Sequence, residues 1–286
     1  MVTTFHLTDD GTMREMAHHG SMSETSADLP EGAYTTFRTY KRKRVLRLNQ
    51  HFRRLEESLT LTGKHFGTIN DVMTRKAIGR IIAMLNYAES RFRLTYVPEG
   101  LFISIEPFTP YPQEIYETGV RCASVSLHRN NPHAKSTTFI ASAAEAYKTL
   151  PEGAHEGLMI ADDGAVLEGL SSNFFALLLP SPRGRGVGGE GEGASLRTEE
   201  ARVLIGVTRS LVLEVARDVV PVISEAVKYN DLPNVSECFI TSVSREILPV
   251  VKIDHQVIGD GKPGPLTREL MRRFRELVER EAEELV

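Results

Sequence analysis

The residues with the clearest chemical potential lie in the run Val166-Leu-Glu-Gly-Leu-Ser-Ser-Asn-Phe-Phe175. Glu168 follows the turn signal Asp162-Asp-Gly164 and precedes an apolar stretch that is typical of a buried strand. A carboxylate there is costly to bury unless it has a dedicated partner. An exposed hairpin glutamate followed by a Ser/Asn turn explains the same run. The run alone therefore leaves a functional carboxylate and an ordinary turn open.

Two further runs place small or hydroxyl residues where an anion could bind. Gly206-Val-Thr-Arg209 stands at the start of a predicted helix, whose free backbone N–H groups and dipole attract a phosphate. Thr241-Ser-Val-Ser-Arg245 follows an apolar strand and ends it with hydroxyl groups. A plain helix cap explains the first run and a polar strand end explains the second.

Two cationic side chains complete the set of candidates. Arg54 shares a helix face with His51, three residues earlier. Lys135 lies in a loop before an Ala-rich helix, and Lys148 inside that helix is the alternative candidate for a reactive lysine. Each of these charges, taken alone, is explained as solvated surface.

Hydrophobic periodicity predicts the elements that must position these residues. We expect strands at 33–40, 91–97, 101–107, 120–127, 157–161, 173–179, 237–243 and 247–253. We expect helices between Asn49 and Gly63 and at 70–89, 137–150, 208–219 and 266–284, with Asn49 as the cap of the first. Residues 1–32 are weakly patterned, and residues 41–44 are typical of a hairpin tip from which 45–48 return as a strand.

The pattern predicts two domains. The proline-rich stretch Thr109-Pro-Tyr-Pro-Gln113 is typical of a boundary. We predict a small α+β domain over 1–110 and a large α/β domain over 118–286, because strands and helices alternate in the second half. The glycine-rich segment 181–193 has little to bury, and we predict a dispensable surface loop there.

Composition narrows the class of protein. A net charge of −4 over 286 residues gives no sign of a nucleic-acid partner. Cys122 and Cys238 fit no disulfide or metal-ligand pattern, and His18-His19 has no further ligand at suitable spacing, so we expect no metal. Neither a leader segment nor a membrane span is indicated. We expect a soluble, cytoplasmic protein.

Together these motifs resemble one family. Their order and spacing resemble those of class IV, fold-type IV pyridoxal-phosphate aminotransferases. The motifs that carry this resemblance are Tyr34, His51-x-x-Arg54-Leu55, Lys135-Ser136, the Glu168 run, the Gly206 run and Thr241-Ser-Val-Ser-Arg-Glu-Ile-Leu-Pro249. That group holds branched-chain and D-amino-acid aminotransferases and aminodeoxychorismate lyase. The resemblance covers residues 31–275 and implies an enzyme of this fold with pyridoxal 5'-phosphate as its cofactor.

The resemblance also implies a role for each matching residue. Lys135 would hold the cofactor covalently and then move the substrate α-proton, which requires a neutral amine beside a cationic or apolar wall. Glu168 would pair with the pyridine nitrogen, and Leu204 would pack on the ring. The phosphate would be held by Arg54, Val207, Thr208, Ser242 and Val243. Tyr34, Arg38 and Arg93 would lie on the substrate side.

The resemblance leaves the reaction with three alternatives. We expect amino transfer between an apolar or branched-chain L-amino acid and a 2-oxo acid, because Phe37, Phe92, Leu94 and Tyr96 add apolar surface around Tyr34. Aminodeoxychorismate lyase shares the same cofactor contacts. A non-catalytic binding protein of the same shape is the alternative of another class, against which the presence of both Lys135 and Glu168 argues. We also expect a homodimer, as in the family.

Overall fold

The computed structural model describes residues 1–16, 18–64, 67–179 and 193–285. Nearly all of the predicted glycine-rich loop at 181–193 lies outside the described residues. The chain forms two compact units. Unit 1 comprises Met1–Pro110, Asn131–Ala144 and Val278–Val286, and unit 2 comprises Tyr111–Asn130 and Glu145–Leu277. The predicted domains at 1–110 and 118–286 stay a prediction, since a compact unit need not fold independently.

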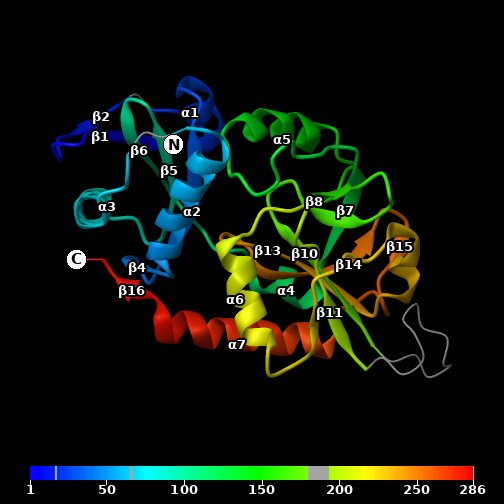
Figure 1. Ribbon diagram of the computed structural model, residues 1–286. Helices are drawn as coiled ribbons and strands as arrows, with labels where there is room; N and C mark the ends of the chain where they lie inside the picture. Colours follow the sequence, from blue (N-terminus) through cyan, green and yellow to red (C-terminus); the bar gives the residue numbers. More distant parts are fainter. Residues whose placement is uncertain (17, 65–66, 180–192, 286) are drawn as a thin grey trace. The chain divides into compact units, whose positions relative to one another are not determined.

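Unit 1 is built on one antiparallel sheet (Figure 1). Across the sheet its strands are β16 (Glu283–Glu284), β4 (Arg44–Val45), β3 (Ala33–Tyr40), β5 (Ser90–Val97), β6 (Gly100–Pro107), β1 (Thr3–Leu7) and β2 (Met13–Glu15). Alternation along β3 and β5 divides the side chains between two faces. One face carries the stacked rings of Phe37 and Phe92, and the other carries Tyr34, Arg38 and Arg93.

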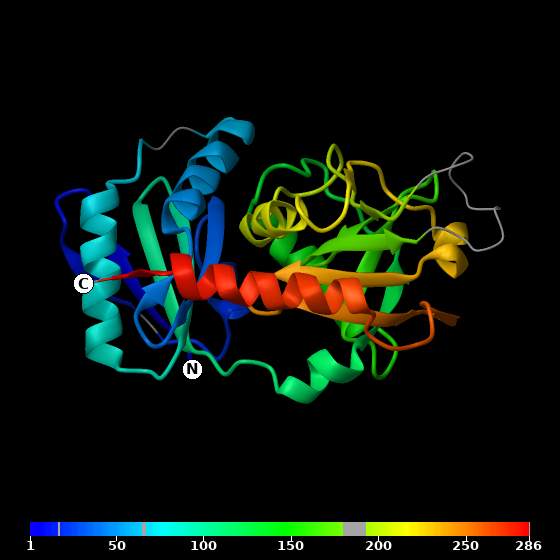
Figure 2. The ribbon, with the colours of Figure 1, turned by 90° about the horizontal axis from the view of Figure 1, so that it is seen from below.

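The helices of unit 1 are α1 (Met22–Asp28), α2 (Leu48–Leu61) and α3 (Asp71–Leu85). Figure 2 shows α2 and α3 beside the strands of this unit. Helix α2 buries Leu48, Phe52, Leu55 and Leu59 at helical spacing, so this stripe faces the core. His51 and Arg54 are buried along with the stripe, and the interpretation of Arg54 as solvated surface is therefore wrong.

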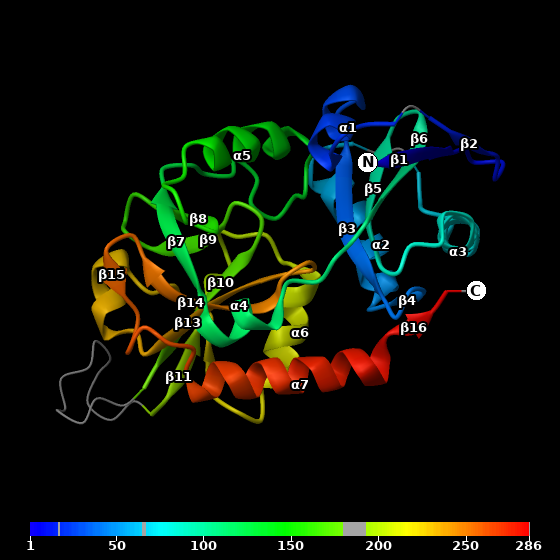
Figure 3. The ribbon, with the colours of Figure 1, turned by 180° about the vertical axis from the view of Figure 1, so that it is seen from behind.

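Residues 1–32, which are weakly patterned in the sequence, form β1, β2 and α1, and β1 pairs with β6 nearly a hundred residues later. Two local predictions fail in unit 1. Strand β4 stops at Val45, so residues 45–48 do not all return as a strand. Helix α2 begins before Asn49, with Arg47 at the cap in a left-handed conformation and no side-chain cap bond. Figure 3 shows β3, β5 and β6 lying side by side.

Unit 2 is built on a mixed sheet. Its strands across the sheet are β12 (Val222–Ile223), β11 (Ser195–Arg197), β10 (Asn173–Leu178), β13 (Glu237–Ser242), β14 (Glu246–Ile253), β7 (Val120–Val125), β8 (Glu156–Ile160) and β9 (Val166–Gly169), with β15 (Gln256–Val257) beside β14. Strand β9 also pairs with β10, at Asn173 opposite Glu168. This pairing closes six strands into a ring, and the ring closes at the motif that contains Glu168.

The helices of unit 2 connect these strands. They are α4 (Gln113–Thr118), α5 (Thr138–Lys148, which begins in unit 1), α6 (Val207–Ala216), the 3₁₀ helix η1 (Tyr229–Asn234) and α7 (Pro265–Glu281). The first backbone N–H groups of α7 are capped by Glu237 of β13, whose carboxylate accepts from Leu266 and Thr267. The elements predicted at 120–127, 137–150, 157–161, 173–179, 208–219, 237–243, 247–253 and 266–284 are all present, with ends shifted by a few residues.

Candidate functional site

The candidate residues fall into two groups, one in each unit, and each group is described by itself. Within unit 1, Lys135 lies on a segment that extends the free edge of β3. Tyr34 N donates to Lys135 O at 2.9 Å, and Thr137 N donates to Gly32 O at 2.9 Å. A Cβ on Gly32 would lie 2.1 Å from the carbonyl oxygen of Tyr96, so this close pairing requires glycine. The edge of β3 thereby fixes the backbone of Lys135.

The side chain of Lys135 points over the ring of Tyr34, with Nζ 4.6 Å from the ring centroid. Its backbone N–H donates to Ser58 Oγ at 3.0 Å, and Ser58 Oγ donates in turn to the carbonyl of Arg54. Ser58 thus links the backbones of the two cationic residues. The rival Lys148 has a side chain that is 69% exposed and paired with Glu145.

Arg54 is buried and has an unused donor. Its Nη2 donates to Thr35 Oγ1 at 2.7 Å. Its Nε is buried and has no hydrogen-bond partner among the described residues. Burial lowers the pKa of Arg54 to about 10, so the guanidinium stays charged at neutral pH. A buried cation with an unused N–H is suited to an anionic ligand.

His51 completes a chain of hydrogen bonds from Arg54. Thr35 Oγ1, which accepts from Arg54, lies 3.0 Å from His51 Nδ1. The Thr35 hydroxyl can donate to Nδ1 of a neutral His51 imidazole while it accepts from Arg54. Burial, and then the charges of Arg54 and Lys135, lower the pKa of His51 well below its usual value.

The two arginines expected on the substrate side have contacts within unit 1. Arg93 donates to Met22 O at 2.8 Å and to Ser26 Oγ at 2.6 Å, so it binds α1, and it lies over the ring of Tyr34. Arg38 is buried, with its guanidinium 4.2 Å from the ring centroid of Tyr40. Their role toward a substrate stays a prediction.

In unit 2 the carboxylate of Glu168 is buried and hydrogen-bonded. Arg129 Nε donates to its Oε1 at 2.8 Å, and the Oε2 accepts from Asn173 Nδ2 at 3.0 Å and Leu204 N at 3.2 Å. The side chain of Glu168 is 3% exposed. The exposed hairpin glutamate is therefore excluded, and an ion pair offsets the cost of burial. Arg129 was not predicted from the sequence, although it follows the apolar strand β7 by four residues.

Asn173 connects Glu168 to the segment before α6. Its Nδ2 also donates to Leu204 O at 2.7 Å, so both backbone groups of Leu204 are held. A Cβ on Gly206 would lie 2.4 Å from Asn173 Oδ1, which explains the glycine. Gly206 is the N-cap of α6 and offers no side-chain cap. The first N–H groups of α6, at Val207 and Thr208, are consequently not capped by it.

The predicted hydroxyl cluster lies at the end of β13 and in the turn that leads to β14. Ser242 Oγ accepts from Arg245 N at 3.3 Å, and Ser242 and Val243 are half-buried. Thr241 is buried, and its Oγ1 has no hydrogen-bond partner among the described residues. The turn thus leaves hydroxyl groups that a ligand could use.

A network around the buried Glu156, which was not predicted from the sequence, supports the turn of the Glu168 motif. Glu156 accepts from Tyr147 at 2.6 Å, from Ser171 and Ser172 at 3.0 Å each, and pairs with Arg245 at 3.2 Å. A Cβ on the motif glycine, Gly169, would lie 2.2 Å from Ser172 Oγ and 2.9 Å from Glu156 Cγ. The glycine and both serines of the motif are thereby explained by packing around Glu156.

The comparisons with known proteins identify the class of this chain. Residues 32–253 match the family model of class IV amino-transferases, so the chain belongs to this family. Its members depend on pyridoxal phosphate. The predicted family and fold class, an α+β and an α/β part in the fold-type IV arrangement, are confirmed.

Particular relatives give a more detailed picture. A Methanocaldococcus jannaschii protein, provisionally assigned as a branched-chain-amino-acid aminotransferase, is 28% identical over 176 residues, 59% of this chain and 56% of that protein. The D-alanine aminotransferase of Staphylococcus haemolyticus is 38% identical over 27% of this chain and 28% of its own. The match therefore spans about half or less of these relatives' lengths. The branched-chain aminotransferase of Thermoproteus uzoniensis, solved with norvaline, has a TM-score of 0.73 at 23% identity, covering 98% of this chain and 95% of its own.

The residues present fit the family cofactor. In unit 1, the unused Nε of Arg54 is suited to a phosphate. In unit 2, the N-terminus of α6, which has no side-chain cap, is also suited to a phosphate. The buried, paired carboxylate of Glu168 is suited to a protonated pyridine nitrogen. Among the described residues there is no group of three His, Cys, Asp or Glu side chains arranged for a metal ion. None of the described helices is long and apolar enough to cross a membrane.

Proposed function

We propose that this protein is a pyridoxal-phosphate-dependent aminotransferase that moves an amino group between an apolar or branched-chain L-amino acid and a 2-oxo acid. The observation that carries the proposal is the buried Glu168, paired with Arg129 inside the family motif. Such a carboxylate inside the family motif is suited to the pyridine nitrogen of the cofactor. When bound, the cofactor supplies an electron-accepting ring that stabilises the charge left by removal of the substrate α-proton.

Lys135 would attach the cofactor covalently and would act as the base that removes the α-proton of the substrate. Support comes from its backbone, held by β3 and Ser58, and from the aromatic wall that Tyr34 forms beside Nζ. A fixed backbone with a long side chain suits a residue that both binds the cofactor and transfers a proton. Lys148 is exposed and paired with Glu145, so it is not suited to this role.

Glu168 pairs with the pyridine nitrogen, and Arg129 keeps the carboxylate in its ionised form. An ionised partner keeps that nitrogen protonated, which is the form that accepts electrons. Leu204 packs on the ring, at a place set by its two backbone hydrogen bonds to Glu168 and Asn173. The donors on Oε2 also prevent the carboxylate from rotating.

The phosphate is held by Arg54, the N–H groups of Val207 and Thr208, and the turn at Ser242 and Val243. Support comes from the unused donor of Arg54 and from the helix N-terminus, which both favour a dianion. Arg54 offers a full charge and the N-terminus of α6 offers a helix dipole, and each of these by itself favours a phosphate.

The substrate side is assigned to Tyr34, Arg38 and Arg93. The apolar surface expected around Tyr34 is wrong, because Phe37, Phe92, Leu94 and Tyr96 lie on the opposite face of the sheet from Tyr34. The preference for a branched-chain substrate therefore rests on the relatives of this chain. The names of the Methanocaldococcus jannaschii and Thermoproteus uzoniensis relatives support a branched-chain substrate, whereas the Staphylococcus haemolyticus relative acts on D-alanine. An assay with both enantiomers of leucine and alanine decides between these substrates.

A labelling experiment tests the cofactor assignment. Borohydride reduction of the cofactor-loaded protein should fix the cofactor onto one peptide, the one that contains Lys135. The Lys135→Ala variant should show no fixation, and Lys148→Ala serves as the matched control that keeps it. Fixation on the peptide with Lys148 instead overturns the assignment.

We also propose that the protein is a cytoplasmic homodimer, because class IV sites are completed by a partner subunit. Light scattering at micromolar concentration should give about twice the mass of one chain, 31.8 kDa. A monomer that transfers amino groups at full rate contradicts this proposal.

A further inference from the structure

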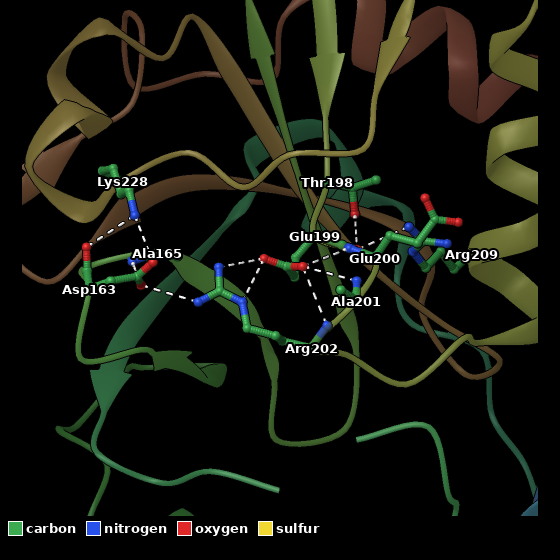
Figure 4. A network of polar contacts seen from close by, with 9 residues as sticks. All are labelled: Asp163, Ala165, Thr198, Glu199, Glu200, Ala201, Arg202, Arg209 and Lys228. Carbon is green, nitrogen blue, oxygen red and sulfur yellow. Dashed lines mark hydrogen bonds and ion pairs between the residues drawn. The ribbon is translucent and has the colours of Figure 1, made fainter. Parts of the chain in front are cut away.

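A second carboxylate, Glu199, organises the loop that leads to Leu204 and α6. Its Oε1 accepts hydrogen bonds from three successive backbone N–H groups, those of Glu200, Ala201 and Arg202, at 3.1, 3.0 and 3.3 Å. Figure 4 shows these bonds converging on one oxygen. The turn is therefore folded around a carboxylate, as a helix N-terminus is folded around its cap.

The other oxygen of Glu199 binds Arg202. Nε and Nη2 of Arg202 both donate to Oε2, at 3.0 and 2.6 Å, and its Nη1 lies 3.2 Å from Asp163 Oδ1 (Figure 4). Asp163 also pairs with Lys228 at 2.9 Å and accepts from Ala165 N. The side chain of Glu199 is 8% exposed and that of Arg202 is 43% exposed. Arg202 thus joins the loop to the turn between β8 and β9.

The backbone around Glu199 is also held. The buried Arg209 of α6 donates from Nη2 to Glu199 O at 3.0 Å, and Thr198 Oγ1 donates to Phe174 O of β10 at 2.9 Å. Glu199 therefore binds α6 through its carbonyl and the loop through its carboxylate. Burial raises the pKa of Glu199, but the hydrogen bonds from Arg202 and the backbone outweigh burial and lower it overall, so the carboxylate is charged at neutral pH.

Leu204 lies only five residues after Glu199, and both of its backbone groups bind the Glu168–Asn173 pair. We propose that Glu199 is a positioning residue that, with Arg202, fixes the segment Leu204–Thr208 against the cofactor. This inference rests on the proposed function, which assigns Leu204, Val207 and Thr208 to the cofactor. Glu199 is linked to Leu204 through the intervening backbone, and to α6 through the hydrogen bond from Arg209.

The test compares Glu199→Gln, Arg202→Gln and Arg202→Lys with the control Glu200→Gln. Glu200 lies in the same loop and is exposed; its carboxylate accepts no hydrogen bond within the described part of the chain, although it lies in the field of Arg209. The first readout is hydrogen exchange of the amides at 200–202 and 204 in cofactor-free protein. The second is the dissociation constant of pyridoxal phosphate, and the third is the circular dichroism of the bound cofactor at saturation.

We expect Glu199→Gln to speed exchange at these amides and to weaken cofactor binding ~10- to 100-fold, the range set by losing hydrogen bonds to a buried charge. The dichroism of the bound cofactor should fall even at saturation, because Leu204 is no longer fixed. Arg202→Gln should have a smaller effect, since the backbone bonds to Glu199 remain, and Arg202→Lys should recover part of it. Glu200→Gln should behave like wild type.

Two results overturn the inference. In the first, Glu199→Gln lowers the melting temperature but leaves the cofactor constant and dichroism unchanged, which means a merely structural role. In the second, Glu200→Gln has the same effect as Glu199→Gln, which means that only the charge of the loop matters. If wild-type protein binds no pyridoxal phosphate, the proposed function fails, whereas the exchange readout still tests whether Glu199 fixes the loop.

Discussion

Arg129 offers the sharpest test of how Glu168 is held. Replacing Arg129 by methionine removes the Nε–H that donates to Glu168 Oε1, while an unbranched side chain stays in its place. Both side chains are nearly buried, at 6% and 3% exposure. Breaking a buried pair by removing one partner costs about 3–5 kcal/mol, because a charge is left in a low dielectric. Asn173 and Leu204 still bind Oε2, so we expect the low end, about 3 kcal/mol.

The assay is denaturant unfolding of the cofactor-free protein at neutral pH. The double variant Arg129→Met/Glu168→Gln should recover most of the loss, because it removes the uncompensated charge as well. Arg280→Met is the control: Arg280 is paired with Glu281 on an exposed face of α7, and its loss should cost less than about 1 kcal/mol. A double variant as unstable as Arg129→Met, or a single variant with unchanged stability, refutes the account of Glu168 as a buried charge.

Two further predictions concern stability. The pKa of His51 is far below its unfolded value of about 6.5, so the unfolded chain binds the extra proton first as pH falls. The free energy of unfolding of wild type should therefore drop by up to about 1.4 kcal/mol per pH unit below pH 6.5. Urea titrations of wild type and His51→Asn over this pH range should differ by this slope, and parallel pH dependences of the two proteins contradict a neutral His51. Gly169→Ala should lower the free energy of unfolding by about 1–3 kcal/mol, because its Cβ would meet Ser172 Oγ. The control Gly193→Ala should leave stability unchanged, because its Cβ would meet nothing within 4 Å. Equal effects of the two substitutions in thermal melts contradict the close packing at Gly169.

Local patterns predicted most elements but not their irregular ends. Strand β3 was predicted with its full bounds because its apolar residues alternate and turn signals flank it. The start of α2 was not, because Arg47 adopts a left-handed conformation that only the tertiary fold can impose on a non-glycine residue. Strand β1 was missed because five residues give a weak pattern, and their pairing with β6 is distant in sequence.

The candidate site shows the same division between local and distant information. Family motifs pointed to Glu168 and Arg54, but the burial of Arg54 depends on β3, which no helical pattern reveals. Arg129 is 39 residues from Glu168, and Glu199 lies in a loop without periodicity, so neither partner could be assigned from spacing. Ion pairs between distant loops depend on how the ring of strands closes, and the sequence pattern does not specify that closure.

The central claim, amino transfer by Lys135, is tested most directly by following labelled nitrogen. The cofactor-loaded protein is incubated with L-leucine carrying an isotope-labelled amino group and an unlabelled 2-oxo acid, and both amino acids are analysed by mass spectrometry. Wild type should move the label to the acceptor and leave the keto acid of leucine, while Lys135→Ala should move none and Lys148→Ala should match wild type. Label that stays on leucine in wild type, or that moves equally in Lys135→Ala, contradicts the proposed function.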